Sequence, residues 1–115
     1  MQEIGKLDHV ALRIKNSSEA VRFFQNVFGM SVVKVRNDGS TKSSVWLSGG
    51  IQLIEDSSPF EEGMMDHVCF LVADIEKTIR LAERFGALPA PERGVGWFRL
   101  REGLVIELKA GLPER

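Results

Sequence analysis

The two halves of this chain have similar sequences, and this duplication limits the available folds more than any other feature. LDHVALRI is echoed by MDHVCFLV, which gives His9 and His67 matching places. NSSEAVRFFQNVFG is echoed by ADIEKTIRLAERFG, and both segments end in Phe-Gly. A strand-like segment with a glutamate closes each half, at Glu55 and at Glu107. Such self-similarity indicates two copies of one supersecondary unit.

Periodicity in the first half predicts four strands and one helix. Asn16 is suited to cap the helix, with Glu19 three residues later, and Gly29 is suited to end it. The strands are expected at residues 7–14, 31–36, 44–48 and 51–55, with turns at Asn37-Asp38-Gly39 and Gly49-Gly50. Alternation of apolar and polar residues indicates that these strands are half-buried.

The second half is expected to repeat this pattern. Asp74 is suited to cap a helix that Gly86 ends. Strands are expected at residues 66–72, 97–101 and 104–109, with a short fourth strand near Leu88 that Pro89 disfavours. The predicted class is α+β, with two tandem β-α-β-β-β modules forming a curled mixed sheet around a metal cavity. A single domain, 1–115, comprises module one (6–56), a linker (57–65) and module two (66–110).

Composition excludes several classes of function. The 115 residues carry a net charge of −1, with both signs mixed along the chain, so neither nucleic acid nor an anionic membrane is an expected partner. Cys69 is the sole cysteine, which rules out an intrachain disulfide. No apolar run approaches the roughly 20 residues of a membrane helix. The expected setting is cytoplasmic, without membrane attachment.

The alternation in the strands also predicts where the repeated polar residues point. His9, His67 and Glu107 lie opposite the apolar faces of their strands and so point away from the helices. Glu55 shares its face with Leu53 and is assigned to the same polar side. Each module then offers one histidine and one glutamate on the sheet face away from its helix. If the sheets curl toward each other, the four side chains can converge.

Two imidazoles and two carboxylates suit a divalent transition metal: Zn, Ni, Co, Mn or Fe. Taken singly, a histidine or glutamate on a strand is more often an ordinary core or solvent-facing residue. The recurrence of both residues at matching places favours metal ligands, because buried carboxylates are costly unless paired or metal-bound.

The duplicated layout resembles the vicinal oxygen chelate superfamily (glyoxalase, bleomycin resistance protein, extradiol dioxygenase) from residue 7 to residue 109. The resemblance implies metal ligands at His9 in LDHVALRI, Glu55 in IQLIE, His67 in MDHVCFLV and Glu107 in LVIEL. This set is similar to that of glyoxalase I. Arg13 matches an arginine that binds the glutathione carboxylate in bacterial glyoxalase I, which implies a substrate-binding role. The alternative interpretation is that Arg13 is a solvent-facing arginine at the end of a strand.

The resemblance implies a divalent-metal-dependent lyase or isomerase acting on a small-molecule substrate with vicinal oxygens. Proton abstraction by Glu107 first, or Glu55 second, would give a stabilised enediolate. The main alternative is a non-catalytic small-molecule binding protein of the bleomycin-resistance kind, with Trp46 and Trp97 lining the cavity. An Fe(II) dioxygenase is a third option. A homodimer is expected, with modules paired within one chain or across two.

Overall fold

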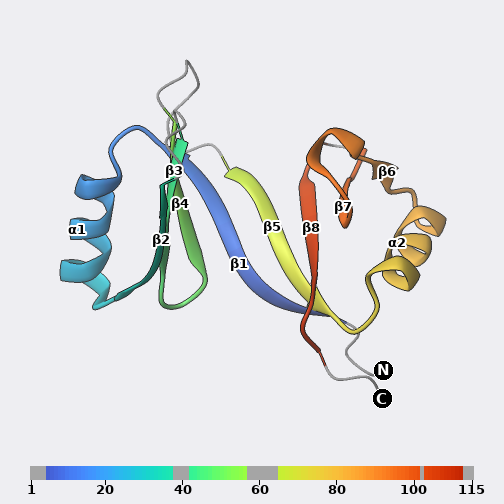
Figure 1. Cartoon of the computed structure of the whole chain (residues 1–115), viewed down its shortest axis with the longest axis horizontal. Helices are drawn as coiled ribbons and strands as arrows, with labels where there is room; N and C mark the ends of the chain where they lie inside the picture. The colour runs from blue at the N-terminus through green and yellow to red at the C-terminus, as the bar shows by residue number, and fades with distance from the viewer. Residues whose placement is uncertain (1–4, 38–41, 57–64, 102, 113–115) are drawn as a thin grey trace. The chain divides into compact units, whose positions relative to one another are not determined.

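The computed structural model describes residues 5–37, 42–56, 65–101 and 103–112. The chain divides into two compact units, which we call the first unit (residues 9–66) and the second unit (residues 1–8 and 67–115). Strand β1 (Gly5–Ile14) begins in the second unit and continues into the first. Among the described residues, each unit contains one α-helix and a set of neighbouring strands (Figure 1).

The first unit has the strand order β2-β3-β4-β1. Its elements after β1 are α1 (Ser17–Phe28), β2 (Val32–Asn37), β3 (Lys42–Leu47) and β4 (Ile51–Asp56). β1 and β4 pair in parallel, whereas the β2–β3 and β3–β4 pairs are antiparallel. The helix between β1 and the later strands provides the long crossover that a parallel pair requires.

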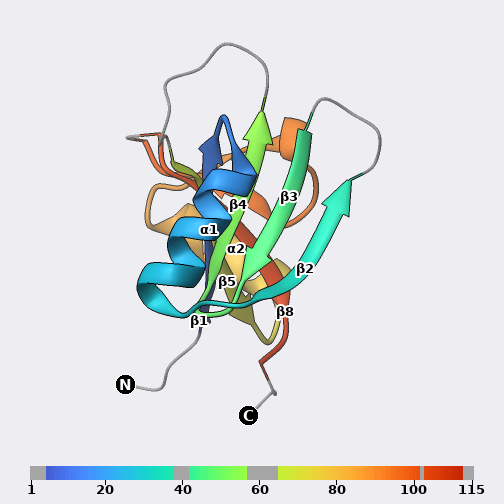
Figure 2. The same cartoon turned by 90° about the vertical axis from the view of Figure 1, so that its left-hand side faces the viewer.

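Helix α1 begins and ends at the residues that its sequence predicts. The side chain of Asn16 accepts a hydrogen bond from the backbone N–H of Glu19 at 3.0 Å. Gly29 adopts a left-handed conformation with φ of 69°, and its N–H bonds to Gln25 O. Such caps satisfy backbone groups that a helix end otherwise leaves unpaired. The helix lies on one face of the first unit's sheet (Figures 1 and 2).

The strand registers show which residues of the first unit share a face. Leu12 and Val45 both pair with Leu53, and together they form the apolar row of the sheet. Ala11 and Trp46 both pair with Gln52, the next residue back along β4. Because successive side chains on a strand point to opposite faces, Gln52 lies on the face away from Leu53.

The second unit has the strand order β5-β8-β7-β6. Its elements are β5 (Met65–Val72), α2 (Ile75–Arg84), β6 (Leu88–Pro89), the 3₁₀ turn η1 (Pro91–Arg93), β7 (Trp97–Arg99) and β8 (Val105–Ala110). β5 and β8 pair in parallel, and the β8–β7 and β7–β6 pairs are antiparallel. Its core contains Val72, Ala87, Phe98 and Leu108, with Phe70, Ile75, Ile79, Ala82 and Ile106 packed around them.

The predicted α+β class with two tandem β-α-β-β-β modules is confirmed, and most strand ends fall within one or two residues of expectation. The short strand near Leu88 exists because Pro89 lies at a sheet edge, where a missing N–H breaks no interior pairing. The predicted strand from Trp97 ends at Arg99 instead of Arg101. Residues 57–64 of the expected linker and Asp38-Gly39 of the expected turn lie outside the described residues. Within the described residues, no helix is long and apolar enough to cross a membrane.

Candidate active site

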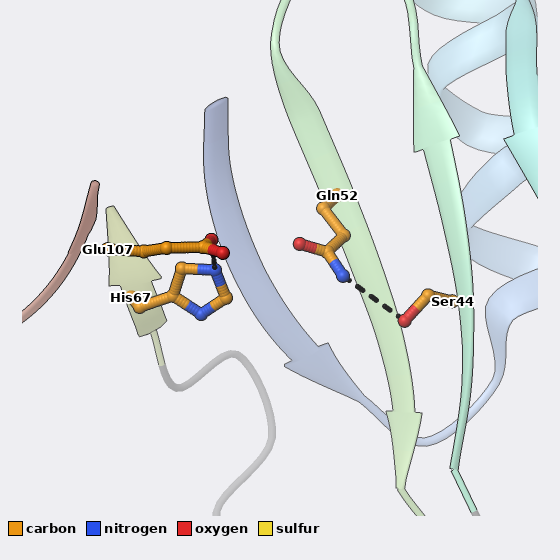
Figure 3. Close-up of polar contacts among 4 residues, drawn as sticks. All are labelled: Ser44, Gln52, His67 and Glu107. Carbon is orange, nitrogen blue, oxygen red and sulfur yellow. Dashed lines mark hydrogen bonds and ion pairs between the residues drawn. The ribbon is translucent and has the colours of Figure 1, made fainter. Parts of the chain in front are cut away.

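The polar face of the second unit holds a histidine–carboxylate pair. His67 Nε2 lies 3.3 Å from Glu107 Oε1 (Figure 3), and the two side chains are 6% and 19% exposed. The parallel register sets Glu107 beside Cys69, two residues after His67 on the same face of β5. A nitrogen atom and an oxygen atom that can both bind a metal ion are therefore held together on neighbouring strands, largely shielded from water.

Trp97 forms a wall beside this pair. It lies directly opposite Glu107 in the β7–β8 register, and its ring meets the His67 imidazole edge-on, with centroids 4.7 Å apart. The Arg93 guanidinium stacks on the indole at 5.1 Å. These contacts restrict the rotation of the imidazole. The preceding Gly96 has φ of +89°, and a Cβ there would lie 3.1 Å from Leu108 O, so β7 approaches β8 closely at this point.

Cys69 lies on the floor of the second unit's polar face, and its side chain is fully buried. Burial, followed by the carboxylates of Glu107 and Asp8, raises the pKa of the thiol to about 12, against the opposing effect of Lys109. The thiol is therefore protonated at neutral pH. It acts as a small neutral residue beside Glu107 and not as a nucleophile.

The polar face of the first unit carries a buried amide. Gln52 and Ser44 are both buried, and Gln52 Nε2 donates a hydrogen bond to Ser44 Oγ at 3.2 Å (Figure 3). Gln52 pairs with Ala11 on β1, and buried His9 lies two residues before Ala11 on the same face. The amide nitrogen is directed to Ser44. The side-chain carbonyl oxygen of Gln52 is therefore the atom that could bind a metal ion.

Gln52 and Glu107 occupy the same place in the two modules. Each lies beside the residue two positions after a histidine, Ala11 in one case and Cys69 in the other. Each also faces a tryptophan on its antiparallel neighbour: Trp46 opposite Gln52 and Trp97 opposite Glu107. The sequence comparison, which aligned Glu55 with Glu107, is therefore three residues out of register.

Glu55 lies on the helix side of its sheet, so its predicted placement on the polar face is wrong. It shares a face with Leu53 and pairs with Ile14 at the far end of β1. Its Oε1 accepts hydrogen bonds from the Ser17 backbone N–H at 2.8 Å and from Ser17 Oγ at 3.1 Å. The carboxylate therefore stabilises the first turn of α1, where unpaired N–H groups and the helix dipole favour negative charge.

Arg13 is on the same face as His9 and is half-buried. Its Nε lies 3.8 Å from Asp66 Oδ1, so the guanidinium has a carboxylate neighbour in its own unit. Arg13 is therefore not the fully solvent-facing arginine that the alternative interpretation predicted. Its expected contact with a substrate carboxylate stays a prediction.

Two features of the sequence pointed to Gln52. Ile51 and Leu53 are apolar and lie on one face, so that face of β4 must be the one against α1. Glu55 has the same parity as Leu53, whereas Gln52 has the opposite parity. Trp46 and Trp97 offered a second signal, since each precedes the closing strand of its module.

The chain matches the family model described as the Glyoxalase/Bleomycin resistance protein/Dioxygenase superfamily over residues 6–105. The chain belongs to this superfamily. It is 34% identical over 108 residues to a protein named mitochondrial methylmalonyl-CoA epimerase from Dictyostelium discoideum. The match covers 79% of this chain, which spans 65% of the length of that relative.

Solved structures of superfamily members share the fold. The structure of methylmalonyl-CoA epimerase from Mycobacterium tuberculosis aligns with a TM-score of 0.72 and 20% identity, covering 94% of this chain and 89% of that one. A variant of the Streptomyces coelicolor methylmalonyl-CoA epimerase, in complex with 2-nitronate-propionyl-CoA, aligns with a TM-score of 0.68 and 18% identity. That match covers 96% of this chain and all of the other. At these identities the likeness is one of fold.

The donor chemistry of the two polar faces fits a divalent transition metal. The second unit offers imidazole nitrogen and carboxylate oxygen from His67 and Glu107, whose ligand atoms are already adjacent. The first unit offers imidazole nitrogen from His9 and amide oxygen from Gln52, both on buried side chains. Borderline divalent ions accept mixed nitrogen and oxygen donors of this type.

Proposed function

We propose that this chain is a divalent-metal-dependent isomerase that epimerises a carbon next to a carbonyl, with a 2-substituted malonyl thioester such as methylmalonyl-CoA as its substrate. The observation that carries the proposal is the buried His67–Glu107 pair, held on one sheet face beside a neutral thiol. The named epimerase relative supports this substrate over a glutathione adduct.

His9, Gln52, His67 and Glu107 are the proposed ligands for Zn, Ni, Co, Mn or Fe(II). Gln52 replaces Glu55 in the ligand set, because the Glu55 carboxylate accepts hydrogen bonds from the first residue of α1. The two donors of each unit act together within one chain or across two copies of it. When bound, the ion supplies positive charge that lowers the energy of an enolate on two neighbouring substrate oxygens.

Glu107 is the proposed general base, acting through the carboxylate oxygen that does not hold the ion. Its carboxylate is mostly buried, so few water molecules compete for the proton that it takes from the substrate carbon. His67 and Trp97 fix its position from two sides. Return of the proton from Glu107 to the same face regenerates the substrate. Delivery of a solvent proton to the opposite face gives the epimer, and Glu107 then releases its proton to solvent. Cys69 beneath it stays neutral and places no further negative charge beside the carboxylate.

Proton exchange at the substrate carbon tests this proposal. We expect purified, metal-loaded protein to incorporate deuterium from D₂O at C2 of methylmalonyl-CoA and to interconvert its two epimers. Protein stripped by a chelator should lose both activities and regain them with added metal. Conversion of methylglyoxal and glutathione to lactoylglutathione instead would favour a glyoxalase-type lyase. Ligand binding without turnover in either assay would favour a bleomycin-resistance-type binding protein.

A homodimer is also proposed, and the exposed apolar residues of the first unit support it. Helix α1 has no buried residue, and its Phe28 is 63% exposed. On the adjacent β2, Val33 and Val35 are 63% and 62% exposed. Several large apolar side chains exposed on consecutive elements are typical of a contact surface between proteins. Sedimentation should show a dimer that Val35→Lys weakens, and a wild-type monomer would contradict the proposal. Cytoplasmic location stays a prediction.

A further inference from the structure

We propose that Lys34, Arg36 and Trp46 form an anion-binding site that selects substrates carrying a second negatively charged group. These residues lie on β2 and β3 of the first unit, outside the proposed ligand set. The inference rests on the proposed function for its choice of substrate, and it makes Lys34 and Arg36 specificity-determining residues. Its direct test is binding of an anion, which requires no turnover.

Two cations lie over one indole ring in this part of the sheet. Lys34 Nζ lies 4.8 Å from the centre of the Trp46 ring, and the Arg36 guanidinium carbon lies 5.4 Å from it. Lys34 pairs directly with Trp46, and Arg36 pairs with Ser44 in the next row. Stacking of this kind orders long cationic side chains that would otherwise sample many rotamers. The ring therefore holds two positive charges in one place.

A β-bulge sets the direction of Lys34. The β2–β3 register passes from Val32 opposite Leu47 to Lys34 opposite Trp46, so Val33 is the extra residue. Without it Val33 would lie opposite Trp46, and Lys34 and Arg36 would point to the helix face. Bulges commonly re-aim side chains next to functional sites. The local backbone thus directs both cations to the face that carries Gln52.

The described residues supply no counter-charge to these two cations. Neither Lys34 nor Arg36 makes an ion pair within the described part of the chain. Two carboxylates of the same unit have other neighbours: Glu55 accepts from Ser17, and Asp66 lies by Arg13. Two like charges held beside one ring repel each other, and a bound anion relieves that repulsion. Both side chains are exposed and therefore open to a ligand.

The position of the two cations sets how long a substrate must be to contact both Gln52 and the anion-binding site. Lys34, Trp46 and Gln52 are paired successively across β2, β3 and β4. Two strand spacings of about 4.8 Å place the Lys34 backbone roughly 10 Å from that of Gln52. A substrate held near Gln52 can therefore extend a carboxylate or phosphate along Trp46 to the cations. A small neutral ketone or aldehyde cannot use this site.

Fluorescence of Trp46 provides the direct test. The chain has two tryptophans, so Trp97→Phe leaves Trp46 as the sole indole reporter. In that background we expect coenzyme A, malonate, or both, to change the emission, with an affinity that falls as salt is added. Lys34→Gln with Arg36→Gln should weaken that binding roughly tenfold to thirtyfold. If the double variant loses affinity for coenzyme A alone, the site binds phosphate. If it loses affinity for malonate, the site binds carboxylate.

Matched variants keep this test decisive. Arg22→Gln removes an exposed cation from α1 in the same unit, on the helix side of the sheet, and should leave binding unchanged. Arg36→Lys should restore most of the affinity lost in Arg36→Gln. Equal affinities in the double variant and in Arg22→Gln would overturn the inference, as would no emission change with either probe. If binding depends on the two cations but no epimerisation occurs, the anion site stands and the proposed function fails.

Discussion

Two hydrogen bonds join the Glu55 carboxylate to Ser17, the first residue of α1. The closing strand of the first module thereby stabilises the start of its helix. A glutamate that appeared to repeat the role of Glu107 is instead a capping group on the opposite face. The distinction leads to opposite expectations for substitutions at Glu55 and at Gln52.

Replacing Glu55 with alanine should lower stability and leave metal binding intact. The variant loses two hydrogen bonds to Ser17 and the favourable interaction with the helix dipole, which together are worth about 1–3 kcal/mol. Urea unfolding followed by circular dichroism measures the change. Glu19→Ala, at an exposed position in the same helical turn, serves as the control and should cost less. Loss of bound metal in folded Glu55→Ala protein would return Glu55 to the ligand set.

Replacing Gln52 with alanine should weaken metal binding by tenfold or more, on the order of losing a well-placed oxygen ligand or its support. Gln52→Glu should retain metal, because a carboxylate offers the same oxygen and the Ser44 hydroxyl, which accepts from Gln52, can instead donate to the carboxylate. Metal content after dialysis against a defined chelator distinguishes the variants. Equal metal content in Gln52→Ala and wild type would contradict the assignment.

Replacing Glu107 with glutamine should lower turnover by at least about a hundredfold, the usual scale for losing a general base. The amide keeps the shape and one oxygen, so the fold should persist and the loss should appear in kcat. Deuterium uptake at C2 of methylmalonyl-CoA measures the step directly. Retained exchange in Glu107→Gln would assign the base elsewhere.

Stability at alkaline pH should depend on Cys69. Its pKa is raised from 9.0 to about 12 in the folded chain, so the folded state holds the thiol proton more tightly than the unfolded state does. This contribution is fully present below pH 9 and is lost as pH rises toward 12. The stability difference between metal-free wild type and Cys69→Ala should therefore shrink from pH 8 to pH 11. A difference that is independent of pH would show that the thiol ionises normally.

Gly96→Ala should destabilise the second unit by about 1–3 kcal/mol. The added Cβ would lie 3.1 Å from Leu108 O in a backbone with φ of +89°. Gly103→Ala is the matched control, because its φ is +104° but nothing lies within 4 Å of its Cβ position. Thermal unfolding of the two variants separates steric contact from backbone strain. Equal losses would show that the contact between β7 and β8 contributes nothing.

The sequence predicted the elements well because their signals are local. Asn16 and Asp74 accept from the residues three positions later, as their capping patterns require. Gly29 ends α1 in the conformation that favours glycine. Short-range backbone chemistry decides each of these features, so one sequence is sufficient to find them.

The site was harder to predict because pairing register is not a local property. Alternation in β4 indicates that Leu53 and Glu55 share the helix-facing side, but it does not say which residue of the opposite face lies beside Ala11. The equivalence of Gln52 with Glu107 depends on the strand pairing that sets Gln52 beside Ala11 and opposite Trp46. The bulge that turns Lys34 toward Trp46 likewise depends on the neighbouring strand.

The neutral amide at Gln52 has an electrostatic consequence. In the proposed ligand set, one carboxylate would bring a single negative charge to a divalent cation, whereas a set with two carboxylates would neutralise it. The resulting centre would keep a net charge of about +1 before any substrate arrives. Substrates that become dianionic as their proton leaves are therefore favoured over neutral dicarbonyls, and the preference originates in one nitrogen atom hydrogen-bonded to Ser44.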